Sequence, residues 1–324
     1  VNAGNSSGHT SQASVTVTVS AESEQFSAAN TICVSNTLST AASWTGYDKA
    51  CPSGATKTNT MVTPSKTDGQ GYDGKLVLLR RGDTWNQLLA TYAAESNYKI
   101  GYFGNYADPK PNIVKGVEIG AYSINGTLND PDSVWTWYGS EDLTAQGFTE
   151  NVTFEGIKTE MISFPPSFQH VGVHDMDLDQ ESSATDYAGR IILGRGHTRC
   201  YTDSGVNCST VPFSRGAYMS KVEIVGTKTA ANRPLVNVAG IGCDTTPFTA
   251  FYNSSVESAG EHNIRIMGWS RLNISSSHIA GNHTAVTKQK ITTRPCFTNN
   301  NKSGGWSDDT WPNKGSMFLD PLGA

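Results

Sequence analysis

Short apolar segments separated by turn residues are the feature that most limits how this chain can fold. From about residue 30 onward each segment holds only a few residues, and Gly, Asn, Ser and Asp fill the stretches between them. The segments are 76–79, 113–119, 152–157, 171–173, 191–193, 222–225, 235–238, 264–266 and 272–274. Apolar runs of this length between turn residues are typical of β-strands. No amphipathic helix of useful length separates them, so an alternating β-α-β fold is excluded.

The composition also favours an all-β fold. The 324 residues include 32 glycines, and only 16% of them are charged. Residues 85–98 are the one stretch that we expect to include a short helix or turn. The irregular spacing of the apolar segments argues against a propeller or a leucine-rich array. Sandwiches, barrels and β-helices therefore remain open.

The charge and the apolar content exclude two kinds of partner. The formal net charge is −5 and no cluster of Lys and Arg occurs, which argues against nucleic acid. No apolar stretch is long enough to span a bilayer, so we expect no membrane insertion.

The six cysteines predict disulfide bonds. None of them forms a Cys-x-x-Cys pair, and an even number suggests an oxidising compartment, outside the cell or on its surface. Proximity in the sequence favours the pairs Cys33–Cys51, Cys200–Cys208 and Cys243–Cys296. Other pairings, or six free buried thiols, stay open.

The N-terminal segment, 1–22, differs from the rest of the chain. Val15, Val17 and Val19 alternate with threonines, which is the period of a single half-buried strand. This segment resembles the last strand of a bacterial Ig-like repeat, which implies a longer modular protein. The alternative is an N-terminal strand or linker of the main domain, which we place at 23–324. The loop-like end, 303–324, is compatible with a domain that is truncated at its C-terminus.

Three motifs carry a resemblance to a known superfamily. They are the run from Arg81 to Trp85 (Arg-Gly-Asp-Thr-Trp), the segment 101–113 with its Lys-Pro-Asn-Ile end, and the Glu-His-Asn-Ile-Arg run within 260–274. Together they resemble secreted proteins of the pectate-lyase-like superfamily over roughly the range 75–295. The resemblance implies a right-handed parallel β-helix, a solenoid with loop insertions that acts on polysaccharide.

A set of cations is the first candidate for chemistry. Arg265 alternates with the apolar residues around it and is expected to face solvent, whereas His262 has the inward parity. Lys288 follows Arg265 after an interval that corresponds to roughly one β-helix coil, so the two would stack on one face. In β-elimination from a uronate, a cation neutralises the carboxylate and a base removes the adjacent proton. The resemblance implies Lys or Arg as the base, so Arg265 and Lys288 are the catalytic candidates, supported by His262. Arg294 and Lys290 would bind substrate. The alternative is that Arg265 and Lys288 are ordinary surface cations and His262 is a hydrogen-bonded core residue.

An acidic run is the second candidate. Asp175, Asp177, Asp179 and Glu181 would share one strand face, where Ca²⁺ could offset their repulsion. The resemblance adds calcium as a carboxylate neutraliser. The alternatives are a solvated acidic face and the carboxylate pair of a glycoside hydrolase. A change of apolar phase between 171–173 and 176–178 also predicts a bend near His174.

Tryptophans are the third candidate. Trp135 and Trp137 would share one strand face, and Trp269 lies near the cations, so all three are candidates for stacking on sugar rings. Packing in the core or in loops is the alternative. The leading prediction is a polysaccharide lyase that acts on a uronate-containing glycan. A non-catalytic surface or adhesin β-helix that binds glycan is the first alternative, and a glycoside hydrolase is the second.

Overall fold

The structure is a computed structural model. The described residues are 2–4, 10–12, 21–39, 42, 44–61, 71–92, 95–122, 149–164, 168–179, 190–193, 215–225, 236–239, 248–257, 264–267, 271–280, 291–294 and 316–317. Within them, the only helices are α1 (Glu22–Gln25) and the 3-10 helix η1 (Ala28–Asn30). All other regular elements are strands, which confirms the all-β prediction.

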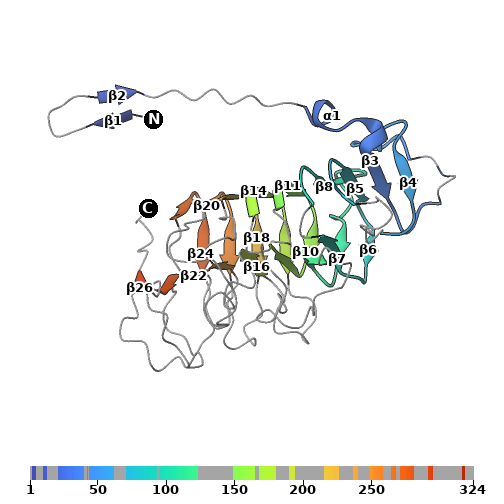
Figure 1. The fold of residues 1–324 in the computed structure, drawn as a ribbon. Coiled ribbons are helices and arrows are strands. Elements are labelled where there is room, and N and C mark those ends of the chain that lie inside the picture. Colours follow the sequence, from blue (N-terminus) through green and yellow to red (C-terminus); the bar gives the residue numbers. More distant parts are fainter. Residues whose placement is uncertain are drawn as a thin grey trace, which may run out of the picture.

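Nearly all of these strands belong to three long sheets (Figure 1). In spatial order, the nine-stranded sheet contains β4 (Thr56–Thr58), β3 (Thr31–Val34), β5 (Leu76–Arg80), β8 (Lys99–Phe103), β11 (Thr149–Glu155), β14 (Phe168–His174), β17 (Arg215–Ser220), β20 (Phe248–Tyr252) and β23 (Arg271–Ser275). The seven-stranded sheet contains β6 (Thr84–Trp85), β9 (Asn112–Ile113), β12 (Lys158–Thr159), β15 (Asp177–Asp179), β18 (Glu223–Val225), β21 (Ser255–Glu257) and β24 (His278–Ala280). The eight-stranded sheet contains β7 (Leu89–Tyr92), β10 (Val117–Tyr122), β13 (Met161–Ser163), β16 (Arg190–Leu193), β19 (Val236–Ala239), β22 (Ile264–Met267), β25 (Ile291–Arg294) and β26 (Ser316–Met317).

The chain visits the three sheets in rotation. From β5 to β25, each strand of the nine-stranded sheet is followed by one of the seven-stranded sheet and then one of the eight-stranded sheet. Neighbouring strands within each sheet are parallel, except that β26 runs antiparallel to β25. This order is compatible with a β-helix. The stretch 85–98, expected to include a helix or turn, forms β6 and β7 in its described part.

Rows of apolar side chains hold the sheets together. One row follows the strand register across the nine-stranded sheet: Ile32, Val77, Ile100, Phe154, Val173, Met219, Phe251 and Ile274. Its inner members lie in the main core, and Ile32 and Ile274 at its two ends are partly buried and pack against that core. Most of these side chains are at most 2% exposed, and burial of a side chain of this size contributes about 1.5–3 kcal/mol. The period-two alternation of each strand therefore becomes a continuous core because equivalent residues stack from strand to strand.

Short turns join the nine-stranded sheet to the seven-stranded sheet. From β11 onward the first residue of each described turn has positive φ: Gly156, Asp175, Lys221, Asn253 and Ser276. The second residue is usually buried, as in Ile157, Met176 and Val222. Backbone hydrogen bonds stack the turns, for example from Asp175 N–H to the Ser220 carbonyl at 3.0 Å. The turn after His174 confirms the bend that the change of apolar phase predicted.

Two glycines with similar φ allow the cost of backbone strain to be distinguished from the cost of a steric clash. Gly156 has φ +66°, and a Cβ there would overlap ring atoms of Tyr102. Gly74 has φ +63° and nothing within 4 Å of such a Cβ. We expect Gly74→Ala to cost about 1 kcal/mol of unfolding free energy and Gly156→Ala about 3 kcal/mol, because only the second adds a clash. Urea denaturation measures both; equal losses would show that the Tyr102 ring moves aside freely.

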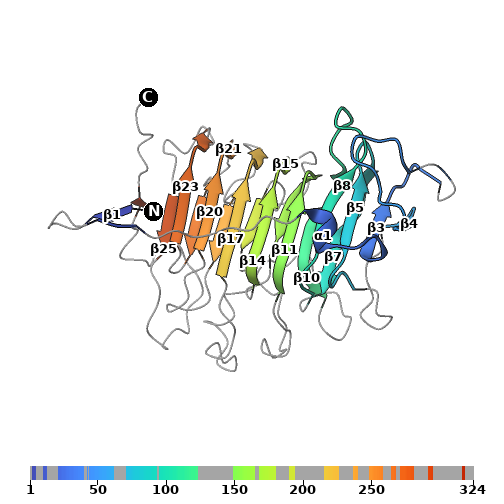
Figure 2. The same ribbon diagram turned by 90° about the horizontal axis from the view of Figure 1, so that it is seen from above.

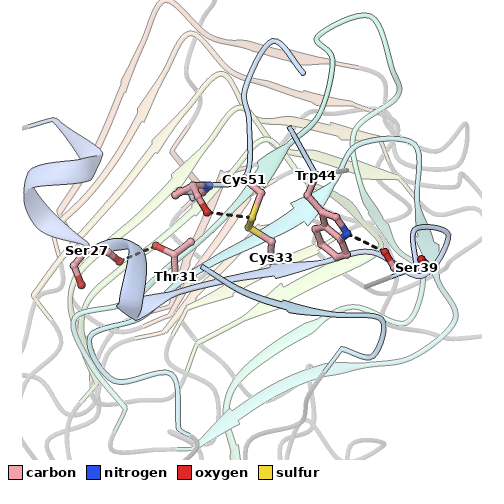
Figure 3. Close-up of a disulfide and its surroundings, with 7 residues drawn as sticks. Ser27, Thr31, Cys33, Ser39, Trp44 and Cys51 are labelled. Atoms are coloured by element: carbon pink, nitrogen blue, oxygen red, sulfur yellow. Dashed lines mark hydrogen bonds between the residues drawn. A yellow bond between two sulfur atoms is a disulfide. The ribbon is translucent and has the colours of Figure 1, made fainter. Parts of the chain in front are cut away.

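A smaller apolar cluster lies on the outer face of the nine-stranded sheet, at its N-terminal end. Trp44 stacks on Phe103 at 5.5 Å between ring centroids, and Leu76 and Leu78 belong to the same cluster. The disulfide Cys33–Cys51 confirms one predicted pair and ties β3 to the covering segment (Figure 3). In the same view the Trp44 indole N–H donates to the Ser39 carbonyl at 3.0 Å. The other four cysteines lie outside the described residues.

The N-terminal segment contributes a separate hairpin. Strands β1 (Asn2–Gly4) and β2 (Thr10–Gln12) pair antiparallel in a sheet of their own. The strand predicted around Val15, Val17 and Val19 lies outside the described residues. Among the residues described, no helix is both long and apolar enough to cross a bilayer.

Candidate functional site

Two of the predicted site residues occupy neighbouring strands of the eight-stranded sheet. Arg265 in β22 pairs with Thr292 in β25, and Met267 pairs with Arg294. Since residues two apart in a strand share a face, Arg265 and Arg294 fall on the same face of adjacent strands. Ile264 and Ile291 are register partners in a different row, and each arginine is separated from that row by the alternation of residues along its own strand. The structure therefore brings these two predicted cations into one region of one sheet.

The strand register corrects one part of the sequence interpretation. Thr292, not Lys288, is the neighbour of Arg265 on the next strand, because the repeat at this point is longer than the interval from Arg265 to Lys288. The interval between register partners also changes along the sheet: Ile191 pairs with Val236, whereas Ile264 pairs with Ile291. The number of residues in one coil is therefore not constant along the chain.

The remaining candidates lie outside the described residues. They are His262, Lys288, Lys290, Trp269, Trp135, Trp137 and Glu181. The predictions made for them stay predictions.

The acidic run is split between a turn and a strand. Asp177 and Asp179 are alternate residues of β15, as predicted, and the buried Leu178 lies between them. Asp175 does not belong to that strand face, because it is the positive-φ residue of the preceding turn. This corrects the prediction of a single row, which ignored the short turn between the sheets.

Lysines neutralise this acidic group. Lys110 Nζ lies 3.3 Å from Asp175 and 2.6 Å from Asp177, and Lys158 Nζ lies 3.8 Å from Asp179. The lysine ammonium groups thus already pair with the carboxylate oxygens that a calcium ion would need as ligands. No group of three or more metal-binding side chains occurs in the part of the chain that the structure describes. The three described aspartates, as placed, do not fit a calcium ion.

The motif from Arg81 to Trp85 has a structural role. Asp83 is fully buried and accepts hydrogen bonds from Ser35 Oγ at 2.6 Å and Thr37 Oγ1 at 2.6 Å. Arg80 Nη1 lies 3.0 Å from the same carboxylate. The backbone amide of Asn112 donates to the Asp83 carbonyl at 2.9 Å, so this motif packs directly against the 101–113 motif. These two resemblance motifs therefore stabilise strands β6 and β9 and the residues that follow β3.

A cluster around Tyr102 was not predicted from the sequence. The ring of Tyr102 has Lys49 Nζ at 4.7 Å and the Arg81 guanidinium at 5.0 Å from its centroid. Burial, and then the charge of Glu155, raise the pKa of Tyr102, so its phenol stays protonated at neutral pH. A protonated phenol can donate a hydrogen bond but does not serve as a base. The only sequence signal was that Arg81 and Tyr102 belong to the two adjoining motifs.

An ion-pair group beside this cluster holds α1 against the nine-stranded sheet (Figure 2). Lys99 Nζ lies 2.7 Å from Glu22 and also contacts Glu155, while Lys49 Nζ lies 3.3 Å from Glu22. Burial alone would raise the pKa of Glu22, but Lys99 and Lys49 together lower it below its usual value. Glu22 is thus anchored to the main body, although we placed the boundary of the N-terminal segment at this residue.

Comparisons with known proteins add no relative to this description. No family model, no curated protein and no solved structure matches the chain.

Proposed function

We propose that this chain is a right-handed parallel β-helix of the pectate-lyase-like superfamily, secreted or displayed on a cell surface. The rotation of the chain through three parallel sheets supports the fold assignment. The disulfide Cys33–Cys51 supports an oxidising compartment. In such a fold, loops inserted between stacked strands project from the body and provide substrate contacts.

We propose further that it cleaves a uronate-containing polysaccharide by β-elimination. The observation that carries this proposal is the pair Arg265 and Arg294 on one face of adjacent strands. One or both guanidinium groups would neutralise the uronate carboxylate, for which the planar guanidinium fork is well suited. Neutralisation stabilises the negative charge that develops when the neighbouring carbon loses its proton.

The elimination balances without an added reactant. A base takes the proton from the carbon next to the carboxylate, a carbon–carbon double bond forms, and the adjacent carbon–oxygen bond to the next sugar breaks. The released oxygen then takes up a proton from an acid of the protein or from water. Lys288 and His262 stay the predicted base and its support. No step depends on calcium, whose role stays a separate prediction.

Absorbance near 235 nm tests the activity directly. We expect a rise when the purified chain is incubated with one of a panel of uronate polymers, because only β-elimination makes an unsaturated uronate. A neutral polysaccharide serves as the control, and each reaction is run with Ca²⁺ and with a chelator. A dependence on Ca²⁺ would support a metal site that includes residues beyond Asp175, Asp177 and Asp179. No rise with any polymer would reject the lyase and favour a non-catalytic glycan-binding β-helix.

A further inference from the structure

We propose that two tyrosines on the outer face of the nine-stranded sheet form a second polysaccharide-binding surface, on a different sheet from Arg265. The exposed large apolar side chains of the described residues are all tyrosines: Tyr106 at 59%, Tyr218 at 50% and Tyr252 at 56% exposure. Tyr218 belongs to β17 and Tyr252 to the adjacent β20 (Figure 2). Tyrosine presents a π-face to the C–H groups of a sugar and a hydroxyl to its polar groups.

The register places the two rings on one face of neighbouring strands. Tyr218 pairs with Ala250, so Tyr252 lies two positions further along the next strand. Strand spacing and rise per residue put the two Cα atoms about 8 Å apart. Met219, which follows Tyr218, and Phe251, which precedes Tyr252, are each only 2% exposed. The opposite face of both strands is therefore the interior face. Both rings are therefore directed to the outside by the same alternation that builds the core.

Small residues flank each tyrosine across the sheet. The register partners of Tyr218 are Gly172 and Ala250, and those of Tyr252 are Ser220 and Ser275. Among the residues that the structure describes, the register neighbours of both rings are therefore small, which suits a flat ligand that lies across the strands. This arrangement differs from the other end of the sheet, where Trp44 covers the outer face.

Gly216 gives the Tyr218 ring a defined resting place. A Cβ at Gly216 would lie 3.1 Å from both Cε2 and the hydroxyl of Tyr218, so the phenol end of the ring lies over this glycine. Gly216 is itself buried and has φ +57°. Any residue with a side chain would push the ring away. A ring that lies back along its strand offers its outer face for stacking rather than standing upright in solvent.

Polar groups beside the rings suit a carbohydrate better than a protein partner. His174 Nδ1 lies 2.5 Å from Ser220 Oγ, and the exposed Ser275 continues the same row on the far side of Tyr252. Hydroxyl and imidazole groups can exchange hydrogen bonds with sugar hydroxyls. Rings separated along and across the strands would contact successive parts of one extended chain. The ligand class is therefore a polysaccharide whose pyranose faces stack on Tyr218 and Tyr252.

This surface goes beyond the proposed lyase activity and does not require it. A polymer held at one sheet while another part of it reaches Arg265 gains affinity by effective concentration, without a new contact at the reacting bond. An oligosaccharide too short to reach both places gains nothing from this linkage, so the tyrosines should increase the affinity of long chains most.

Affinity electrophoresis in gels that contain each polymer tests the surface. We expect Tyr218→Ala and Tyr252→Ala each to weaken polymer binding by about three- to tenfold, and the double variant by more. Tyr218→Phe should bind almost as the native chain does, because it keeps the ring. Tyr106→Ala is the matched control, since it removes an equally exposed tyrosine from the loop between β8 and β9. Thermal unfolding verifies that each variant is folded.

Three outcomes would overturn the proposal. They are native affinity in the double variant, an equal loss in Tyr106→Ala, and no retardation of the native chain by any polymer. Sedimentation adds a fourth, because a dimer that the tyrosine variants abolish would mark the face as an interface between copies. Release of unsaturated product from short oligosaccharides reports the lyase separately. Absence of that activity in the native chain leaves the binding result interpretable.

Discussion

Asp83→Ala is expected to lower the free energy of unfolding by about 3–4 kcal/mol, because removal of the carboxylate leaves several donors without an acceptor. The carboxylate of Asp83 is fully buried and accepts from Ser35, Thr37 and the backbone amide of Asn36, with Arg80 as its ionic partner. Each buried unsatisfied donor costs about 1–3 kcal/mol. Urea denaturation monitored by far-UV circular dichroism measures the change.

Asp48→Ala is the control for this substitution. Asp48 is exposed and accepts a hydrogen bond from the backbone amide of Tyr106 at 2.8 Å. Its loss is expected to cost under about 1 kcal/mol, because water replaces the acceptor. A loss for Asp83→Ala as small as that for Asp48→Ala would contradict the structural role assigned to the motif. The resemblance at Arg81–Trp85 would then need another explanation.

The strands themselves could be predicted because burial on one face leaves an apolar pattern. The predicted segments 76–79 and 171–173 fall within β5 and β14. The predicted segments 113–119 and 152–157 each continued across a corner, that is, a connection between two sheets, instead of ending at it. β9 ends at Ile113 and β10 begins at Val117, while β11 ends at Glu155 before the turn at Gly156. A short turn whose second residue is buried does not interrupt an apolar run, so the pattern conceals the corner.

The register between strands could not be predicted from the sequence. Val152 pairs with Val171, which follows it closely in the chain, whereas Lys99 pairs with Thr153 across a much longer interval. Insertions of unequal length at the corners do not change the core, so nothing in the apolar pattern constrains them. This variation explains why an assumed constant coil length failed to identify the neighbour of Arg265.

The same variation concealed the partners of the acidic run. Lys110 contacts Asp175 and Asp177 although several strands separate it from them along the chain. The sequence showed only a row of like charges, for which a bound cation was the simplest remedy. In the structure, Lys158 of β12 and Lys110 from the loop before β9 supply that positive charge. Candidate metal sites in stacked parallel sheets therefore need the register before their ligands can be counted.

Arg265→Ala is expected to reduce kcat/KM on a free-acid uronate polymer by about 100-fold. That loss corresponds to about 2.7 kcal/mol of transition-state stabilisation, typical of removing one group that stabilises developing negative charge. Arg265→Lys should retain part of the activity, because the charge stays while the guanidinium fork is lost. Arg271→Ala is the matched control, since Arg271 belongs to β23 of the nine-stranded sheet. Initial rates of the rise in ultraviolet absorbance measure all three variants.

A methyl-esterified polymer separates charge neutralisation from a structural effect of the same substitution. Esterification removes the carboxylate charge, so the arginine has less to neutralise and the penalty of Arg265→Ala should shrink several-fold relative to the free-acid polymer. A substitution that merely disturbed β22 would reduce the rate on both polymers equally. Equal losses on both, or a loss in Arg271→Ala as large as in Arg265→Ala, would remove Arg265 from the reaction. The neutralising role would then have to be sought among other cations of the chain.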